Sequence, residues 1–213
     1  MSNTDGNATR RTFLHGTAAG FAAVTGAVAG LSGTSGRAWS APGELRNPPQ
    51  PGDRYAFGFR APRTPLTVGS TSAHLDVRGE LAFEVTASDP RQPWNVRMRI
   101  TRFRATGSDA ELGPVTLEHR GGAPDSRLVV TSEHPARWTH AVLIDLAVTA
   151  ENPPSTAGPL VLRAEEPARL SGEITTFPPQ GELYGLTRPV ELVAEGSGPA
   201  GAVEELPAEV GTP

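Results

Sequence analysis

The stretch "HLDVRGELAFEV", residues 74–85, alternates apolar and polar side chains. The apolar side chains share one face and stand at Leu75, Val77, Leu81, Phe83 and Val85. The charged and polar side chains share the other and stand at His74, Asp76, Arg78, Glu80 and Glu84. A period of two over this length is typical of a strand with one buried face. Gly79 interrupts the pattern and predicts a bulge or a tight bend.

The same alternation recurs on both sides of this stretch, over residues 55–59, 94–101 and 142–148. Shorter strand candidates cover residues 65–69, 113–119, 126–131, 159–164, 168–177 and 183–194. Turn-forming segments such as "SDPRQP" and "AENPPSTAG" separate them. Within the stretch from 54 to 194, no segment carries a helical apolar stripe for three turns. The sequence therefore predicts one all-β domain over residues 54–194, with about nine strands in an antiparallel β-sandwich or a lipocalin-like barrel.

Both flanks of this domain have a composition unlike its own. Residues 41–53, "APGELRNPPQPGD", form a Pro-rich leader that we expect to be extended or disordered. Residues 195–213 contain four glutamates and no aromatic residue. Because such a segment has little apolar surface to bury, we expect a disordered acidic tail.

The N-terminal segment "ATRRTFLHG", residues 8–16, resembles the twin-arginine export signal. The matching positions are Arg10, Arg11, Phe13 and Leu14, and His15 stands where the pattern usually has lysine. This resemblance implies recognition by the twin-arginine (Tat) machinery, which exports proteins already folded, and a secreted or cell-envelope location.

An apolar, Ala- and Gly-rich stretch follows the two arginines, from residue 16 to residue 31. It is too short and too Gly-rich to predict a membrane span. Small residues at 38 and 40 fit cleavage before Ala41, so residues 1–40 are expected to be a removed signal peptide. A buried helix of the mature domain is the alternative, which four glycines in sixteen residues disfavour.

Composition excludes several classes of function. The chain has no cysteine, so disulfides, cysteine–metal sites and a lipoprotein anchor are excluded. Residues 1–40 carry three arginines and one aspartate, so their removal would change the net charge from −4 to −6. A chain this acidic is a poor general binder of nucleic acid or of an anionic membrane surface. We expect no nucleic-acid partner and no stable membrane insertion after cleavage.

The residues of the mature chain do not predict an enzyme. Ser72, His74 and Asp76 share a strand face, but a solvated face has the same composition, and no oxyanion-hole motif accompanies them. The mature histidines 74, 119, 134 and 140 are scattered, which favours surface or turn positions over a metal site. We expect no metal, no cofactor and no catalytic residue.

Arg97 and Arg99 share one face of the segment "RMRITRFR". This face is a candidate contact for an anion or for an acidic protein partner. The alternative is a solvated face that pairs with the acidic face of a neighbouring strand, since opposite charges across strands are favourable.

The segment "GELYGLTRPVELVAEG", residues 181–196, resembles one late stretch of the YceI-like family. The matching positions are Gly185, Leu186, Thr187, Arg188, Pro189, Val190 and Leu192. A second similarity covers residues 79–100, "GELAFEVTASDPRQPWNVRMRI". The resemblance implies a secreted, lipocalin-like barrel that binds polyisoprenoids or other long apolar ligands. The hairpin that usually follows the Pro-Val strand of that family is missing, because the acidic tail begins there.

Three hypotheses follow for the mature chain, and the third, an enzyme, has no constellation of core residues to support it. The first is a non-enzymatic binding protein that holds a small apolar molecule or lipid, lined by the large apolar residues Phe57, Phe59, Phe83, Trp94, Met98 and Tyr184. Plain core packing by the same residues is the simpler interpretation, because small barrels fill their interiors with side chains. The second is an accessory protein for a co-exported enzyme or for the cell envelope, without a small-molecule ligand.

Overall fold

The computed structural model describes residues 48–154, 156–196 and 198–211. The predicted signal peptide and most of the Pro-rich leader lie outside these residues, including Arg10, Arg11, Phe13 and Leu14. Within the described residues the chain forms thirteen strands and no helix. They are β1 (Arg54–Val68), β2 (Thr71–Ser88), β3 (Val96–Asp109), β4 (Gly113–His119), β5 (Ser126–Glu133), β6 (Ala136–Ile144), β7 (Leu146–Ala150), β8 (Leu160–Ala164), β9 (Ala168–Ile174), β10 (Glu182–Leu186), β11 (Val190–Ala194), β12 (Pro199–Val203) and β13 (Ala208–Gly211).

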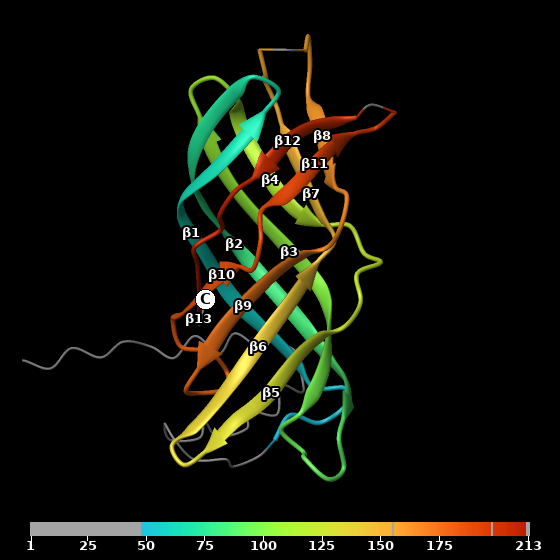
Figure 1. Ribbon diagram of the computed structural model, residues 1–213, viewed down its shortest axis with the longest axis vertical. Helices are drawn as coiled ribbons and strands as arrows, with labels where there is room; N and C mark the ends of the chain where they lie inside the picture. The colour runs from blue at the N-terminus through green and yellow to red at the C-terminus, as the bar shows by residue number, and fades with distance from the viewer. Residues whose placement is uncertain (1–47, 155, 197, 212–213) are drawn as a thin grey trace, which may run out of the picture. The chain divides into compact units, whose positions relative to one another are not determined.

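All strand pairs are antiparallel, and they join into one sheet that closes on itself in two places. The three long strands β1, β2 and β3 take part in both closures (Figure 1). At one end the ring continues through β4, β7, β8, β11 and β12 and returns to β1. At the other end it continues through β5, β6, β9, β10 and β13 and returns to β1. The sheet therefore surrounds one interior, although it is not a regular barrel.

The irregularity has a simple origin. After β3 the chain forms five extended segments, and a short break divides each of them into two consecutive strands. These segments are β4 and β5, β6 and β7, β8 and β9, β10 and β11, and β12 and β13. Counted as segments, eight antiparallel stretches follow one another around the ring in sequence order. The all-β class and the antiparallel pairing are confirmed, and the expected number of about nine strands is wrong.

The prediction of a disordered tail is also wrong. Residues 199–203 and 208–211 are the two strands that complete the rings against β1. Val203, Leu206 and Val210 are buried there. Composition could not indicate this, because these short strands are ordered by a partner strand about 140 residues earlier in the chain rather than by their own apolar content.

Gly79 forms no bulge, since the register of β2 runs through it without a shift against both neighbours. It permits a close approach of β3 instead. A Cβ at this position would lie 2.0 Å from the carbonyl oxygen of Arg104. The register of β1 shifts between Ala61 and Thr64, where Asp76 accepts the backbone N–H of Arg63 at 2.8 Å.

The side chains that fill the interior differ between the two ends. The aliphatic half, enclosed by β1–β4, β7, β8, β11 and β12, is filled mainly by Leu, Val and Ala. The aromatic half, enclosed by β1–β3, β5, β6, β9, β10 and β13, contains the large rings of Phe57, Phe83, Trp138 and Tyr184. Two of the three buried polar residues of the described chain, Ser126 and His140, lie on strands that enclose the aromatic half.

Candidate functional site

The aromatic half contains a connected series of rings. Tyr55 stacks beside Phe57 with ring centroids 6.3 Å apart, and Phe57 contacts Phe83 at 6.0 Å. Phe83 lies 5.3 Å from His140, which lies 5.6 Å from Tyr184. These contacts come from β1, β2, β6 and β10, so closure of the sheet is what brings the rings together.

A second group of rings lies on β6 and on the connection between β2 and β3. The rings of Trp94 and Trp138 are 5.3 Å apart. Trp138 and His140 stand two positions apart on β6, so both side chains belong to its inward face. Phe177, from the connection between β9 and β10, packs edge-on against Tyr55 at 5.0 Å.

Gly172 creates the space that joins His140 to Tyr184. It pairs with His140 across β6 and β9, and a Cβ there would lie 2.9 Å from two ring carbons of Tyr184. Without that Cβ, the tyrosine ring lies across β9 and its Oη reaches His140 Nδ1 at 2.9 Å. The pair is fully enclosed, since His140 is 0% exposed and Tyr184 is 3% exposed.

Burial sets the protonation of both groups. Removal from water lowers the pKa of His140 to about 3. Burial, with a smaller contribution from the charge of Glu182, raises the pKa of Tyr184 well above its usual value. Both side chains are therefore neutral at pH 7, and the hydrogen bond between them joins two uncharged groups.

Two nitrogens in this interior lack a hydrogen-bond partner among the described residues: Nε1 of Trp138 and Nε2 of His140. Their residues are only 1% and 0% exposed. A buried polar group without a partner costs roughly 1–3 kcal/mol. Natural cores contain few such groups, and two on one strand face require an explanation.

A cavity of about 350 Å³ lies next to this region and opens to solvent. It is lined by residues 91–94 of the β2–β3 connection and by residues 130–133 of β5. Trp94, one of its walls, contacts Trp138, and Val130, another, pairs with Trp138 across β5 and β6. Two residues that line the cavity are therefore neighbours of Trp138.

The six predicted lining residues are all buried. Phe57, Phe83, Trp94 and Tyr184 belong to the aromatic half just described. Phe59 instead packs against Phe103, with ring centroids 5.0 Å apart. Met98 is fully buried on β3, opposite Ser126 of β5.

Sequence reasoning missed His140, Trp138 and Gly172. We expected the histidines at surface or turn positions, whereas His140 lies inside the sheet. A signal was present, because Trp138 and His140 continue the alternation of Val142 and Ile144. Extending the strand four residues towards the N-terminus would have placed both on its apolar face.

The predicted arginine face divides in two. Arg99 approaches Glu84 at 3.8 Å, and Arg102 approaches Glu80 at 3.6 Å, so the acidic face of β2 pairs with these residues. Arg97 lies directly opposite Arg127 of β5, and neither forms an ion pair within the described residues. These two exposed arginines line an open groove of about 450 Å³.

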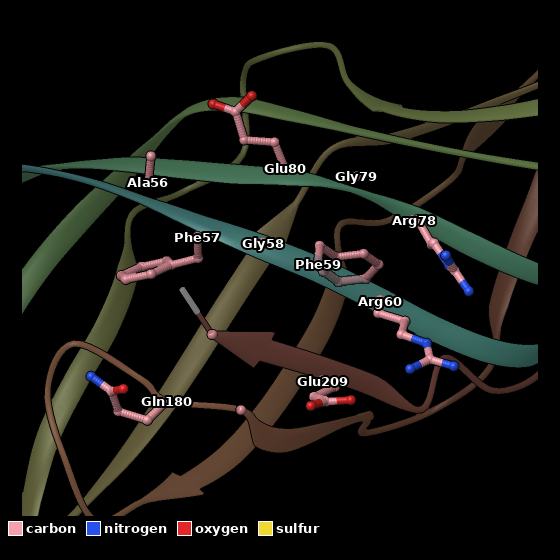
Figure 2. A pocket seen from close by; sticks show the side chains of 12 residues that line it. Ala56, Phe57, Gly58, Phe59, Arg60, Arg78, Gly79, Glu80, Gln180 and Glu209 are labelled. Carbon is pink, nitrogen blue, oxygen red and sulfur yellow. The ribbon is translucent and has the colours of Figure 1, made fainter. Parts of the chain in front are cut away.

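Another groove, of about 580 Å³, runs beside β1 and β13. Figure 2 shows Arg60 and Arg78 together at one end of it, with Glu209 and Gln180 across from β1. Arg60 on β1 is opposite Arg78 of β2 on one side and opposite Glu209 of β13 on the other. With Glu80, the lining holds two arginines and two glutamates, so it offers no net charge to an ionic ligand.

The rest of the described chain adds little chemistry. The described residues contain no group of three or more His, Asp and Glu side chains placed to hold a metal ion. Asp76, from the Ser72–His74–Asp76 face considered above, accepts a hydrogen bond from the backbone N–H of Arg63. None of the described segments is a helix with the length and apolarity to cross a membrane.

Comparison with known proteins gives a likeness of fold. No protein-family model matches the chain, and no curated protein matches its sequence. The solved structure of DynF, from the dynemicin biosynthesis pathway of Micromonospora chersina, is similar with a TM-score of 0.64. The similarity covers 84% of this chain and 86% of DynF, at 17% sequence identity. At this identity the likeness establishes the shared architecture and carries no statement about activity.

Proposed function

We propose that this chain is an exported, non-enzymatic protein that binds a small apolar molecule inside the aromatic half of a lipocalin-like barrel. The observation that carries the proposal is the pair of buried, unpartnered nitrogens on β6 among aromatic rings. A bound molecule would supply what both lack. Apolar walls with a few placed polar groups are the usual composition of small-molecule sites.

Three further features support this proposal. The sheet closes around one interior, and two residues that line an open cavity are neighbours of Trp138. The segment from Gly185 to Leu192 resembles a family of secreted lipid-binding barrels. The twin-arginine pattern at Arg10 and Arg11 supports export through the Tat machinery and a secreted or envelope location.

Native mass spectrometry of the mature protein purified from its own host tests the binding. We expect a reproducible mass above that of the polypeptide, which organic extraction releases as one apolar compound. The control is the same protein after extraction and refolding, which should regain the mass when the extract is returned. A polypeptide mass alone, from several gentle preparations, would contradict the binding proposal.

The export proposal has its own test. Replacing Arg10 and Arg11 with lysine keeps the charge but removes the twin-arginine pair. We expect the precursor to accumulate in the cytoplasm, while the unmodified chain is found outside the membrane. Undiminished secretion of the Arg10→Lys, Arg11→Lys variant would overturn the Tat assignment.

A second candidate function is favoured by Arg97 and Arg127. Arg97 and Arg127 stand directly opposite each other across β3 and β5, and an acidic partner would relieve the repulsion between these like charges. This supports an accessory protein that contacts a co-exported or envelope protein. An Arg97→Glu variant should lose such a partner in a pull-down from the host envelope, whereas Arg99→Gln should retain it. Equal capture by both variants would exclude this surface.

A further inference from the structure

We infer that the bound molecule presents a neutral carbonyl oxygen, of the ketone or quinone type, to Trp138 Nε1 and His140 Nε2. The inference rests on the proposed binding function and specifies the chemical class of its ligand. It follows from which hydrogens the two nitrogens carry, where they lie, and which charges are absent around them.

The hydrogens follow from a count of donors and acceptors. An indole Nε1 is always a donor. A neutral imidazole carries one proton, either on Nδ1 or on Nε2. If Nδ1 carried it, both the hydroxyl hydrogen of Tyr184 and Nε2 of His140 would be left without partners. If Tyr184 donates to Nδ1, only the Nε2–H remains unsatisfied. The second arrangement leaves fewer buried groups unpaired, so both free nitrogens are donors.

Their position puts both donors on one face of one strand. Trp138 and His140 are separated by one residue on β6, and both are enclosed by the sheet. Each is flanked by an aromatic ring, since Trp94 contacts Trp138 and Phe83 contacts His140. Two donors among flat apolar walls fit a flat, mostly apolar molecule that carries an oxygen acceptor on its edge. The cavity of about 350 Å³ that Trp94 lines is the open space nearest along the chain of contacts to Trp138.

The surroundings disfavour a charged acceptor. The buried polar residues of the described chain are Thr64, Ser126 and His140, so no buried lysine or arginine compensates an anion there. A carboxylate moved into such an interior would lose its hydration without a counter-ion. Burial also lowers the pKa of His140, so the imidazole does not supply the missing positive charge at neutral pH. A neutral carbonyl needs only the two donors that are present.

Matched probes test the inference on the mature protein. Fluorenone and fluorene have nearly the same shape, and only fluorenone has a carbonyl oxygen. We expect fluorenone to bind at least about tenfold more tightly, because two buried hydrogen bonds are gained. Fluorene-9-carboxylate should bind more weakly than fluorenone. Titration is followed by tryptophan fluorescence and by the infrared C=O band of fluorenone, which should move to lower frequency when bound.

Two variants locate the contact. Trp138→Phe and the double variant His140→Phe, Tyr184→Phe should each reduce the preference for fluorenone over fluorene about threefold or more. Phe103→Leu, in the packing contact with Phe59, is the control and should keep the preference. If a variant fails to fold, the indole N–H resonance of Trp138 in the unmodified protein decides, because a carbonyl acceptor should shift it and fluorene should not.

The outcomes separate the inference from the proposed function. Equal binding of fluorenone and fluorene would overturn the carbonyl inference and leave apolar binding intact. Tighter binding of the carboxylate would overturn it in favour of an acidic ligand. Binding of neither probe, together with a polypeptide mass alone in native mass spectrometry, would overturn both.

Discussion

Gly172 shows how one missing Cβ shapes the interior. A Cβ at Gly172 would lie 2.8 Å from the carbonyl oxygen of Leu183 and 2.9 Å from the ring of Tyr184. We expect Gly172→Ala to lower the free energy of unfolding by about 1–3 kcal/mol, because ring and backbone must both move. Urea denaturation measures the loss, and the shift of the Tyr184 resonances reports movement of the ring away from His140.

Gly185→Ala is the matched control for this substitution. Gly185 follows Tyr184 directly on β10, and a Cβ there would meet nothing within 4 Å. Its stability should therefore stay close to that of the unmodified protein. If the two alanine variants are equally stable, the close approach of Tyr184 to Gly172 does not exist in solution.

His140 makes stability depend on pH. Its pKa is lowered to about 3 in the folded chain, whereas in the unfolded chain it has the ordinary value near 6.5. Below pH 6.5 the unfolded state therefore binds a proton that the folded state does not. The contribution of the neutral, buried imidazole to stability should be fully present above about pH 6.5. Below that pH, the free energy of unfolding should fall by of order 1 kcal/mol for each pH unit. Urea denaturation between pH 7 and pH 4.5 measures this slope.

The double variant His140→Phe, Tyr184→Phe removes the histidine together with its hydrogen-bond partner. Its stability should depend less steeply on pH than that of the unmodified protein. A smaller dependence should remain, because partial burial also lowers the pKa of His119. Identical slopes in both proteins would mean that His140 is hydrated in solution.

At the scale of elements, the short breaks between paired strands are held by specific contacts. His119 ends β4, and its Nδ1 accepts the backbone N–H of Asp145, the residue that separates β6 from β7. The carbonyl of Asp145 in turn accepts the backbone N–H of Arg120. These two hydrogen bonds join the end of β4 to the break between β6 and β7.

The β2–β3 connection is the element that covers Trp138. Its last residue, Asn95, accepts the backbone N–H of Val130 on β5 through Oδ1 at 3.0 Å. We expect Asn95→Ala to loosen the connection, with faster amide hydrogen exchange at Val130 and little change at Leu128. The global free energy of unfolding should fall by only about 1 kcal/mol, the usual worth of one hydrogen bond.

Gln92→Ala is the comparison for this element. It removes the side-chain contact with Asn95 but leaves the hydrogen bond from Val130 to Asn95 in place. Exchange at Val130 should then remain slow. Fast exchange in the Gln92 variant, or slow exchange in the Asn95 variant, would show that the side chain of Asn95 does not hold the connection.

At the scale of the whole molecule, closure depends on the last two strands. β12 pairs with Leu66–Val68 and β13 pairs with Gly58–Arg60, both on β1. A chain ending at Glu195 would lose these ladders and the burial of Val203, Leu206 and Val210. Burial of one such side chain stabilises by about 1.5–3 kcal/mol, so the sum is a large part of a typical domain stability. We expect no cooperative thermal unfolding in calorimetry.

The truncation removes acidic charge together with the two strands, so a control is needed that removes charge alone. Glu204 and Glu205 are exposed between β12 and β13. Replacing both with glutamine removes half of the four acidic charges of residues 195–213 but leaves both strands. This variant should unfold cooperatively near the temperature of the unmodified protein. A shortened chain that unfolds at the same temperature would mean that closure contributes nothing to stability.

The sequence by itself determined which way side chains point. Alternation over residues 74–85 identified the buried face of β2, and the same pattern put Phe57 and Trp94 on apolar faces that are buried in the structure. It also indicated that the acidic face of β2 would pair with arginines, as Glu84 does with Arg99. These are local properties, because the pleat of a strand sends successive side chains to opposite faces whatever the strand pairs with.

The tertiary structure alone decided which strands meet. The ordering of residues 199–211, the reach of Tyr184 across Gly172, the Arg97–Arg127 pair and the unpartnered nitrogens of Trp138 and His140 all follow from contacts between distant segments. An alternating pattern names no pairing partner, because any strand can offer the same backbone hydrogen bonds to many others. The site therefore exists only in the closed sheet, which places β6, β9 and β10 around one interior.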